Sequence, residues 1–206
     1  MVETICNKLT LRIRTKMPEI DDERAEVINY GLQLIVGEIP KFFLLFLIAY
    51  MCGVLELSIL VLLIVTPYRA VSGGAHFTTH IECIVATSLF YTGNAILSQQ
   101  FVLEKPIQYI ITAIVWVFSM IMIKIYAPAD TEAVPILRKK ERKIRRILSY
   151  IIMTIMLFLS LIIQNTVISN MFLIATFLQT VALTRFMYKI ARNKYGYEEY
   201  MKNNQV

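Results

Sequence analysis

Charged side chains are scarce in this chain, and so are the residues that interrupt regular structure. Asp, Glu, Lys and Arg together make up 17% of the 206 residues, against about 25% in typical soluble domains. Only 7 glycines and 6 prolines are present, and no flexible linker divides the chain. Because 57% of the residues are hydrophobic and the mean hydropathy is +0.59, the composition excludes an ordinary soluble domain and favours a small membrane bundle.

Cysteine is equally sparse. Cys6, Cys52 and Cys83 are odd in number and far apart, which argues against a disulfide framework, and neither a CxxC pair nor zinc-ligand spacing occurs. The first 26 residues are polar and charged, so no removable signal peptide is expected. No motif in the sequence requires a metal ion or another cofactor.

Six apolar runs follow the polar N-terminal segment. They occupy residues 27–52, 54–66, 80–98, 107–126, 147–165 and 168–188. About 20 residues are needed to cross a bilayer core, so most of these runs are long enough. Because proline disfavours helix in the residue before it, the short second run is expected to end at Thr66, before Pro67. Pro40 predicts a kink in the first run, where Glu38 and Lys41 are spaced to neutralise each other.

The distribution of basic residues predicts how these helices are oriented. With the N-terminus in the cytoplasm, 18 of the 21 Lys and Arg residues fall in cytoplasmic segments. These segments are 1–26, 66–79, 127–146 and 185–206. The positive-inside rule therefore favours both termini on the cytoplasmic side.

We therefore expect an all-α polytopic integral membrane protein with about six transmembrane helices. A single domain covers residues 1–206, made of a polar cytoplasmic segment (1–26), a helical membrane bundle (27–188) and a cytoplasmic tail (189–206). Since the basic residues follow the membrane orientation, the net charge of +6 does not predict a nucleic-acid partner.

The most reactive side chains gather in one polar gap between two apolar runs. This gap, YRAVSGGAHFTTHIEC, covers residues 68–83 and holds both histidines of the chain. A nucleophilic cysteine needs a base, a setting that favours thiolate, and donors for the oxyanion that forms on attack. The pair Gly73-Gly74 lets the backbone bend and offers N–H groups to that oxyanion.

A helix is expected to begin within this gap. Thr79-x-x-Glu82 has the pattern of a capping box, which starts a helix near His80. Cys83 then lies at or near the first turn, where the positive end of the helix dipole lowers the pKa of a thiol. The carboxylate of Glu82 works against that effect.

Two histidines compete for the role of base, and their spacing leaves the choice open. On a continuous helix His80 precedes Cys83 by three residues and shares its face. His76 precedes Cys83 by seven residues, about 10.5 Å along the axis, which is too far for a hydrogen bond. Either His80 is the base, or the chain turns at 77–79 and folds His76 back over the helix start.

The same residues also fit plainer interpretations. Free cysteines in apolar runs mostly pack, which is the role assigned to Cys6 and Cys52. A non-enzymatic membrane protein, such as a small transporter or assembly factor, would carry a similar sequence. Another thiol enzyme, such as an acyltransferase, is a further alternative to a cysteine peptidase.

The stretch RAVSGGAHFTTHIEC resembles the signature region of the accessory gene regulator B (AgrB) family, bacterial membrane endopeptidases of peptide quorum sensing. The matching positions are Arg69, Gly73, Gly74, His76 and Cys83. The segment APADTEAVPI, residues 127–136, is followed by a basic run and resembles a second recognisable segment of that family. Length, six-helix layout and charge pattern agree with the resemblance.

The resemblance implies an activity and its residues. His76 would be the catalytic histidine and Cys83 the nucleophile, which favours the bent loop over His80. Family members cut the C-terminal tail from a short propeptide, AgrD, through an acyl-enzyme thioester. Cyclisation to a thiolactone or lactone follows, and the product serves quorum sensing. The resemblance further implies a homodimer in the lipid of the bacterial cell membrane, with the site at the cytoplasmic side and no cofactor.

Other polar residues receive weaker roles. Arg69 would bind a substrate carboxylate or anchor the loop to lipid headgroups. Asp130 would orient His76, although ordinary turn and cap chemistry is the favoured interpretation. The run RKKERKIRR, residues 138–146, anchors the next helix on anionic lipid and is a candidate for gripping an acidic substrate tail. Three ionisable residues are candidates for lining a cavity: Glu38, Lys41 and Glu56.

Overall fold

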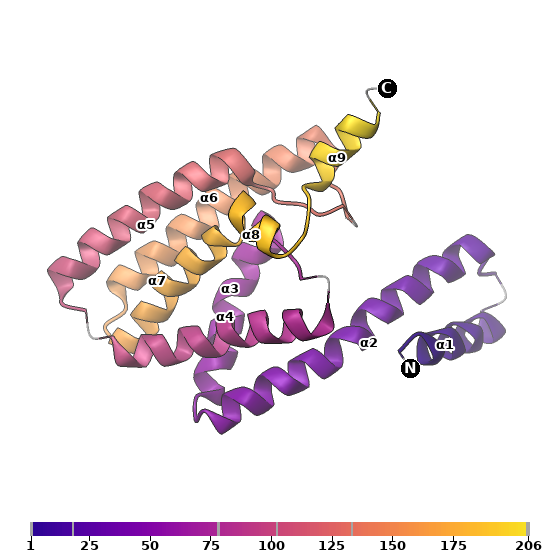
Figure 1. Cartoon of the computed structure of the whole chain (residues 1–206), viewed down its shortest axis with the longest axis horizontal. Helices are drawn as coiled ribbons and strands as arrows, with labels where there is room; N and C mark the ends of the chain where they lie inside the picture. Colours follow the sequence, from indigo (N-terminus) through magenta and orange to yellow (C-terminus); the bar gives the residue numbers. More distant parts are fainter. Residues whose placement is uncertain (1, 18, 78, 102, 133, 205–206) are drawn as a thin grey trace. The chain divides into compact units, whose positions relative to one another are not determined.

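A computed structural model describes residues 2–17, 19–77, 79–101, 103–132 and 134–204, and over these residues it contains nine α-helices and no strand. The helices are α1 (Val2–Lys16), α2 (Asp22–Met51), α3 (Leu55–Ser72), α4 (His80–Gln100), α5 (Lys105–Tyr126), α6 (Lys139–Ile162), α7 (Thr166–Val181), α8 (Arg185–Ile190) and α9 (Gly196–Asn203). Figure 1 shows them coloured along the chain from indigo to yellow. The predicted all-α fold class is confirmed.

The chain divides into two compact units, Met1–Leu47 and Ile48–Val206. In the first unit, α1 and the beginning of α2 are joined by polar contacts. Arg14 forms an ion pair with Asp22 at 2.8 Å. The helix α2 continues through Pro40, and Lys41 pairs with Glu38 at 2.5 Å, as their spacing predicts. The N-terminal segment, expected only to be polar, is therefore largely helical.

Among the described residues, five helices are long and apolar enough to cross a membrane, namely α2, α3, α4 from Ile81 to Gln100, α5 and α6. The helix α7 is also apolar but has only 16 residues. Each of the six predicted runs thus corresponds to one of these helices. Two of the predicted boundaries are wrong, and both errors lie where the candidate site is built.

Pro67 does not end α3, contrary to the prediction that this run stops at Thr66. The helix continues through Pro67 to Ser72 and has 18 residues, about 27 Å at the usual rise per residue. A proline inside a helix removes one hydrogen bond and crowds the preceding turn. The following turn is held by packing, because Tyr68 is fully buried and its hydroxyl shares a 3.1 Å hydrogen bond with the Thr180 hydroxyl. Tertiary contacts therefore override the local preference.

The last predicted run, 168–188, is divided into two helices. The helix α7 ends at Val181, and α8 begins behind Thr184, whose side chain caps it. No glycine or proline marks this break, so the sequence carries no strong stop signal. The break has a structural consequence, since the carbonyl of Ala182 accepts a 3.0 Å hydrogen bond from the N–H of Ala75 in the predicted reactive loop.

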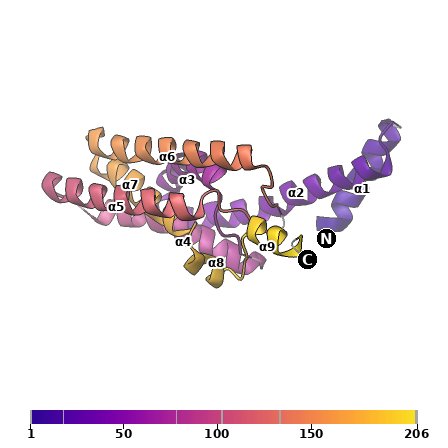
Figure 2. The same cartoon turned by 90° about the horizontal axis from the view of Figure 1, so that it is seen from above.

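Within the second unit, α7 lies against α3, α4, α5 and α6. Figures 1 and 2 show α8 and α9 at the end of this bundle where α5 ends and α6 begins. Half of the residues of α7 are buried, and five of them are polar: Ser169, Asn170, Thr176, Gln179 and Thr180. Polar side chains of this size join helices by hydrogen bonds inside a bilayer.

Three of the five buried positions of α5 are polar, whereas its exposed face is mainly apolar. Its buried positions recur every three or four residues: Gln108, Thr112, Val115, Ser119 and Ile123. Its exposed face contains Ile110, Ile114, Val117 and Ile121. This is the reverse of a helix in a soluble protein, whose apolar stripe faces the core. The pattern therefore supports a membrane protein independently of total hydropathy.

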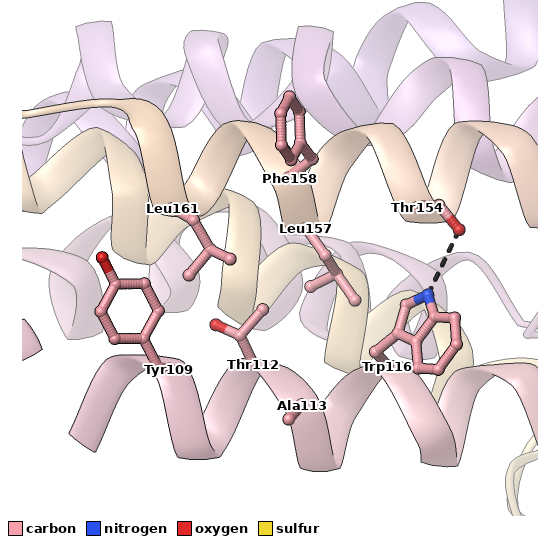
Figure 3. Close-up of a pocket in the computed structure, with 8 residues that line it drawn as sticks. All are labelled: Tyr109, Thr112, Ala113, Trp116, Thr154, Leu157, Phe158 and Leu161. Carbon is pink, nitrogen blue, oxygen red and sulfur yellow. Dashed lines mark hydrogen bonds between the residues drawn. The ribbon is translucent and has the colours of Figure 1, made fainter. Parts of the chain in front are cut away.

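A pocket of about 250 Å³ lies between α5 and α6. Figure 3 shows the residues that line it. Its lining is mainly apolar, and the indole N–H of Trp116 donates to the Thr154 hydroxyl at 3.4 Å across it. None of the three residues predicted to line a cavity, Glu38, Lys41 and Glu56, borders this pocket.

Candidate functional site

Two glycines end α3 and turn the chain away from the helix axis. Gly73 has φ +74° and Gly74 has φ +141°, conformations that side chains disfavour. A Cβ atom at Gly73 would lie 2.2 Å from the carbonyl oxygen of Ala129. The loop can approach the segment after α5 this closely only because position 73 has no side chain.

Main-chain hydrogen bonds join this loop to the segment that follows α5. The N–H of Gly74 donates to the carbonyl of Ala129 at 2.9 Å, and the N–H of Ala129 donates back to the carbonyl of Ser72 at 2.8 Å. Gly73 and Ala129 thereby form an isolated parallel β-bridge. The two stretches singled out in the sequence, far apart along the chain, are thus adjacent in space.

The two glycine N–H groups are already engaged, which differs from the expectation that they serve an oxyanion. Gly73 donates to the carbonyl of Arg69 at 2.9 Å, and Gly74 donates to Ala129. A donor bonded to a buried carbonyl would leave that carbonyl unsatisfied if it turned to a substrate. In this arrangement the glycines contribute their conformation rather than their N–H groups.

Arg69 braces the same loop from α3. Its guanidinium donates to the carbonyl of Ala75 at 3.0 Å and to the side-chain oxygen of Gln179 at 3.2 Å. The Gln179 amide in turn donates to the carbonyl of Gly73 at 2.8 Å and to the Ser72 hydroxyl at 3.1 Å. The described contacts of Arg69 are therefore with the loop and α7, a role that neither predicted alternative included.

His76 lies beyond the glycine turn and outside any helix. The residue is exposed, and its backbone N–H donates to the side-chain oxygen of Asn193 at 2.7 Å. Because α4 begins only at His80, His76 and Cys83 do not share a continuous helix. The choice between His76 and His80 as the base stays a prediction. Residue 78 and the side chain of His80 lie outside the described residues.

Cys83 is the fourth residue of α4, and its side chain is half-buried. The Thr79 hydroxyl accepts the N–H of Glu82 at 3.2 Å, so the predicted N-cap is confirmed. The Cys83 N–H donates to the carbonyl of Thr79 at 3.0 Å, and its sulfur lies 3.9 Å from the Thr87 hydroxyl. The sulfur therefore sits near the N-terminal end of α4.

Replacing Gly73 with alanine is expected to destabilise the fold by about 2–3 kcal/mol, because the new Cβ meets both a positive φ and the Ala129 oxygen. The free energy of unfolding in detergent micelles, followed by circular dichroism during denaturant titration, measures the loss. Gly93→Ala is the matched control, since nothing lies within 4 Å of its added Cβ and alanine favours helix. Equal stability of both variants would contradict this account of the turn.

Asp130 is buried beside the loop and holds other segments together. Its Oδ2 atom accepts from Arg142 at 3.0 Å, from the Ile136 N–H at 2.8 Å and from the Tyr197 N–H at 3.1 Å. The Arg142 guanidinium also stacks 4.4 Å above the Tyr197 ring. These contacts tie the segment after α5 to α6 and α9. They are of the structural kind that the sequence favoured over a direct contact with His76.

The basic run of residues 138–146 forms the N-terminal cap residue and the first turns of α6. Some of its side chains point inward to the loops, and others are exposed. Its inward guanidinium groups reach main-chain carbonyls, with Arg146 bonded to Ala127 at 2.8 Å and Arg145 to Ala70 at 3.4 Å. Four other cations of the run are exposed: Arg138, Lys139, Lys140 and Lys143. Part of the run is thus bound to the loops of the site, and part remains accessible.

Two residues of the site were not singled out from the sequence. Gln179 is a fully buried polar residue within an apolar run, and polar groups at such depth are a usual sign of a functional or packing role. Asn193 lies in a polar tail, where nothing distinguishes it from its neighbours. Only the fold brings it to His76.

The remaining predictions concern the three cysteines and metal binding. All three cysteines are free thiols; Cys6 is buried, Cys52 is exposed and Cys83 is intermediate. Over the described residues, no group of three or more His, Cys, Asp or Glu side chains is placed to hold a metal ion.

The sequence matches a known protein family over most of its length. The model of the family "Accessory gene regulator B" matches residues 5–183. An AgrB-like protein of Listeria monocytogenes serotype 4a is 26% identical over 87% of each chain. One from Clostridium acetobutylicum is 24% identical over 86% of this chain and 85% of the relative. No solved structure matches at a comparable level of significance.

The matched residues include the whole glycine turn, the segment after α5 and α4. Five helices of membrane-spanning length and composition agree with a membrane protein. Because the match covers far more than half of the sequence, the chain belongs to the accessory gene regulator B family and takes part in the accessory gene regulator system of quorum sensing.

Proposed function

We propose that this protein is a membrane-embedded cysteine endopeptidase that removes the C-terminal tail of an AgrD-like propeptide. One observation carries the proposal. A loop held by α3, α7 and the segment after α5 presents exposed His76 just before the helix whose first turns carry half-buried Cys83. A thiol near a helix N-terminus and an imidazole on an adjacent braced loop supply the nucleophile and the base that acyl transfer needs.

In the proposed reaction His76 takes the proton of the Cys83 thiol, and the thiolate attacks the carbonyl that precedes the propeptide tail. The C–N bond breaks, and the imidazolium returns its proton to the departing amine. The N-terminal part of the propeptide is then held on Cys83 as a thioester. The released tail carries a free amino terminus.

Cyclisation completes the proposed reaction. A cysteine thiol within the bound peptide attacks the thioester, a thiolactone forms, and Cys83 is released with its proton restored. A serine hydroxyl at that position would give a lactone instead. Thioester exchange is nearly even in energy, so hydrolysis must be suppressed, and the lipid-facing surroundings of the bundle serve to limit water.

The site belongs, in this proposal, to the cytoplasmic side of the bacterial cell membrane, and the protein acts as a homodimer. The orientation is supported by the basic residues, because 18 of the 21 Lys and Arg lie in the segments on one side of the predicted membrane helices. Labelling of Cys83 with a membrane-impermeant maleimide tests it. Cys83 should react in inverted vesicles and stay unlabelled in intact cells, whereas the opposite pattern would overturn the orientation.

The exposed cations at the start of α6 are proposed to hold the acidic tail of the propeptide. Reversing two of them, Lys139→Glu with Lys140→Glu, is expected to raise the KM for propeptide about tenfold while kcat changes less, because opposite charges are replaced by like charges. Lys202→Glu, at an exposed position of α9, is the control. An unchanged KM in a protein with unaltered topology would remove this part of the proposal.

A direct experiment tests the activity. Purified protein in anionic liposomes is mixed with a synthetic AgrD-like propeptide, and the intact mass of the protein is followed. The proposal expects an added mass equal to the N-terminal fragment, lost on treatment with hydroxylamine, and a cyclic product one water lighter than the linear acid. Propeptide left intact under all conditions would favour the non-enzymatic alternative, and transfer of the acyl group to another acceptor would favour an acyltransferase.

A further inference from the structure

Three successive amides of the reactive loop are held by three different partners. Gly74 donates to the carbonyl of Ala129, and Ala75 donates to the carbonyl of Ala182. His76 donates to the side chain of Asn193. The first two partners are main-chain carbonyls, which any residue provides. The third is a side chain, so its identity can be changed without altering the backbone elsewhere.

Asn193 is itself held in a defined turn after α8. The preceding residue, Arg192, has φ +56°, a left-handed conformation that is uncommon for a residue with a side chain. The Asn193 N–H donates to the carbonyl of Tyr188 at 2.9 Å, and its side-chain amide donates to the carbonyl of Ala191 at 3.2 Å. These bonds leave the amide oxygen directed at His76.

Two stacked tyrosines fix this turn to the rest of the second unit. The rings of Tyr188 and Tyr195 are 4.0 Å apart and nearly parallel. Tyr188 donates to the carbonyl of Asp130 at 3.1 Å, and Tyr195 donates to the carbonyl of Leu183 at 2.6 Å. Burial raises the pKa of both hydroxyls above its ordinary value, so both remain protonated donors at neutral pH.

We infer that Asn193 is a positioning residue that sets the main chain of His76 relative to Cys83, an inference that rests on the proposed function. The residue lies beyond residues 5–183, which the family model matches. In Cys-His-Asn peptidases an asparagine completes the catalytic group. Here Asn193 contacts the backbone of the histidine, so it acts through the placement of that residue rather than on the reacting atoms.

The hydrogen bond itself can be tested without any activity assay. The chain has only two histidines, so protein labelled with ¹⁵N-histidine gives two backbone amide signals, and His76→Ala assigns them. In Asn193→Ala the His76 amide is expected to exchange with deuterium about threefold to tenfold faster, the equivalent of one lost hydrogen bond. Asn193→Asp retains an acceptor and should restore slow exchange. Asn203→Ala, at the exposed end of α9, is the matched control.

The positioning role is tested by the rate at which Cys83 becomes acylated in the liposome assay. Asn193→Ala is expected to lower this rate on the order of tenfold to a hundredfold, because a displaced base loses its alignment with the thiol. Asn193→Asp should recover most of the rate, a rescue that general destabilisation would not produce. The melting temperature of Asn193→Ala, measured alongside, should stay within a few degrees of wild type.

The outcomes separate this inference from the function on which it rests. If the wild-type protein is acylated and Asn193→Ala is acylated at the same rate, the positioning role is overturned but the proposed function is not. Unchanged exchange at His76 in Asn193→Ala overturns it as well, since the bond would then hold nothing in place. A wild-type protein that never forms the acyl species overturns the proposed function and, with it, the catalytic meaning of the contact.

Discussion

Replacing Cys83 with alanine is expected to abolish propeptide cleavage and the covalent acyl species together. Alanine removes the only atom that the proposed reaction attaches to the peptide, so no partial activity should remain through the same route. Cys83 is half-buried on α4, and its sulfur has one described contact, with Thr87 at 3.9 Å. The variant should therefore fold normally, and intact mass spectrometry after mixing with propeptide measures the effect.

The two histidines should behave differently in the same assay. His76→Ala is expected to lower the acylation rate by about 10²–10⁴, the usual contribution of a general base. His80→Ala is expected to retain most of the activity, since position 80 opens α4 and the proposal assigns the base to His76. If only the His80 change stopped turnover, the assignment of the base to His76 would be wrong.

Replacing Asp130 with alanine is expected to cost about 3–5 kcal/mol of unfolding free energy. The carboxylate is 1% exposed and is paired with Arg142, which is 18% exposed. Removing one partner of a buried ion pair leaves the other charge without compensation. The Ile136 and Tyr197 N–H groups would lose their acceptor at the same time. Denaturant titration in detergent micelles measures the loss.

A nearby surface ion pair provides the matched control. Glu132 and Lys194 lie 3.3 Å apart and join the segment after α5 to the stretch before α9, but both side chains are more than half exposed. Exposed pairs contribute roughly 1 kcal/mol or less, so Glu132→Ala should be nearly neutral. Comparable losses for the two substitutions would show that burial of the Asp130 pair is not the reason for its importance.

The predictions for Cys83, His76 and Asp130 address different parts of one arrangement. The candidate nucleophile lies on a helix, whereas the candidate base lies on a loop whose shape is held by hydrogen bonds from three segments: α7, the stretch after α5 and the turn after α8. A loop positioned in this way can be precise without regular structure of its own. Loss of the Asp130 carboxylate should therefore reduce acylation as well as stability, since it ties the stretch after α5, one of those segments, to α6 and α9.

Much of this protein could be predicted from local sequence. Apolar runs of sufficient length must form helices in a bilayer, because each buried backbone group needs an internal partner. The N-cap at Thr79 followed from its hydroxyl and the glutamate three residues later. The pair Glu38 and Lys41 followed from helical spacing alone. Each of these features depends on residues within one or two helical turns of one another.

The errors have a common cause. Pro67 and the uninterrupted run 168–188 are interpreted from local preference. In the structure a long-range contact holds Tyr68 in the turn after Pro67, and the break after α7 is matched by a long-range hydrogen bond from Ala75 to Ala182. The glycine N–H groups were assigned to an oxyanion because the sequence cannot display Ala129, the residue that already accepts one of them.

The sequence by itself determined the helical membrane fold, the start of α4 at its cap, and the residues that carry the family resemblance. Only the tertiary structure decided how the loop of His76 is held, because Ala129, Gln179, Ala182 and Asn193 reach it from distant parts of the chain. Local patterns encode preferences that act over a few residues. Hydrogen bonds between segments more than a hundred residues apart depend on how the helices pack, and that depends on the whole chain at once.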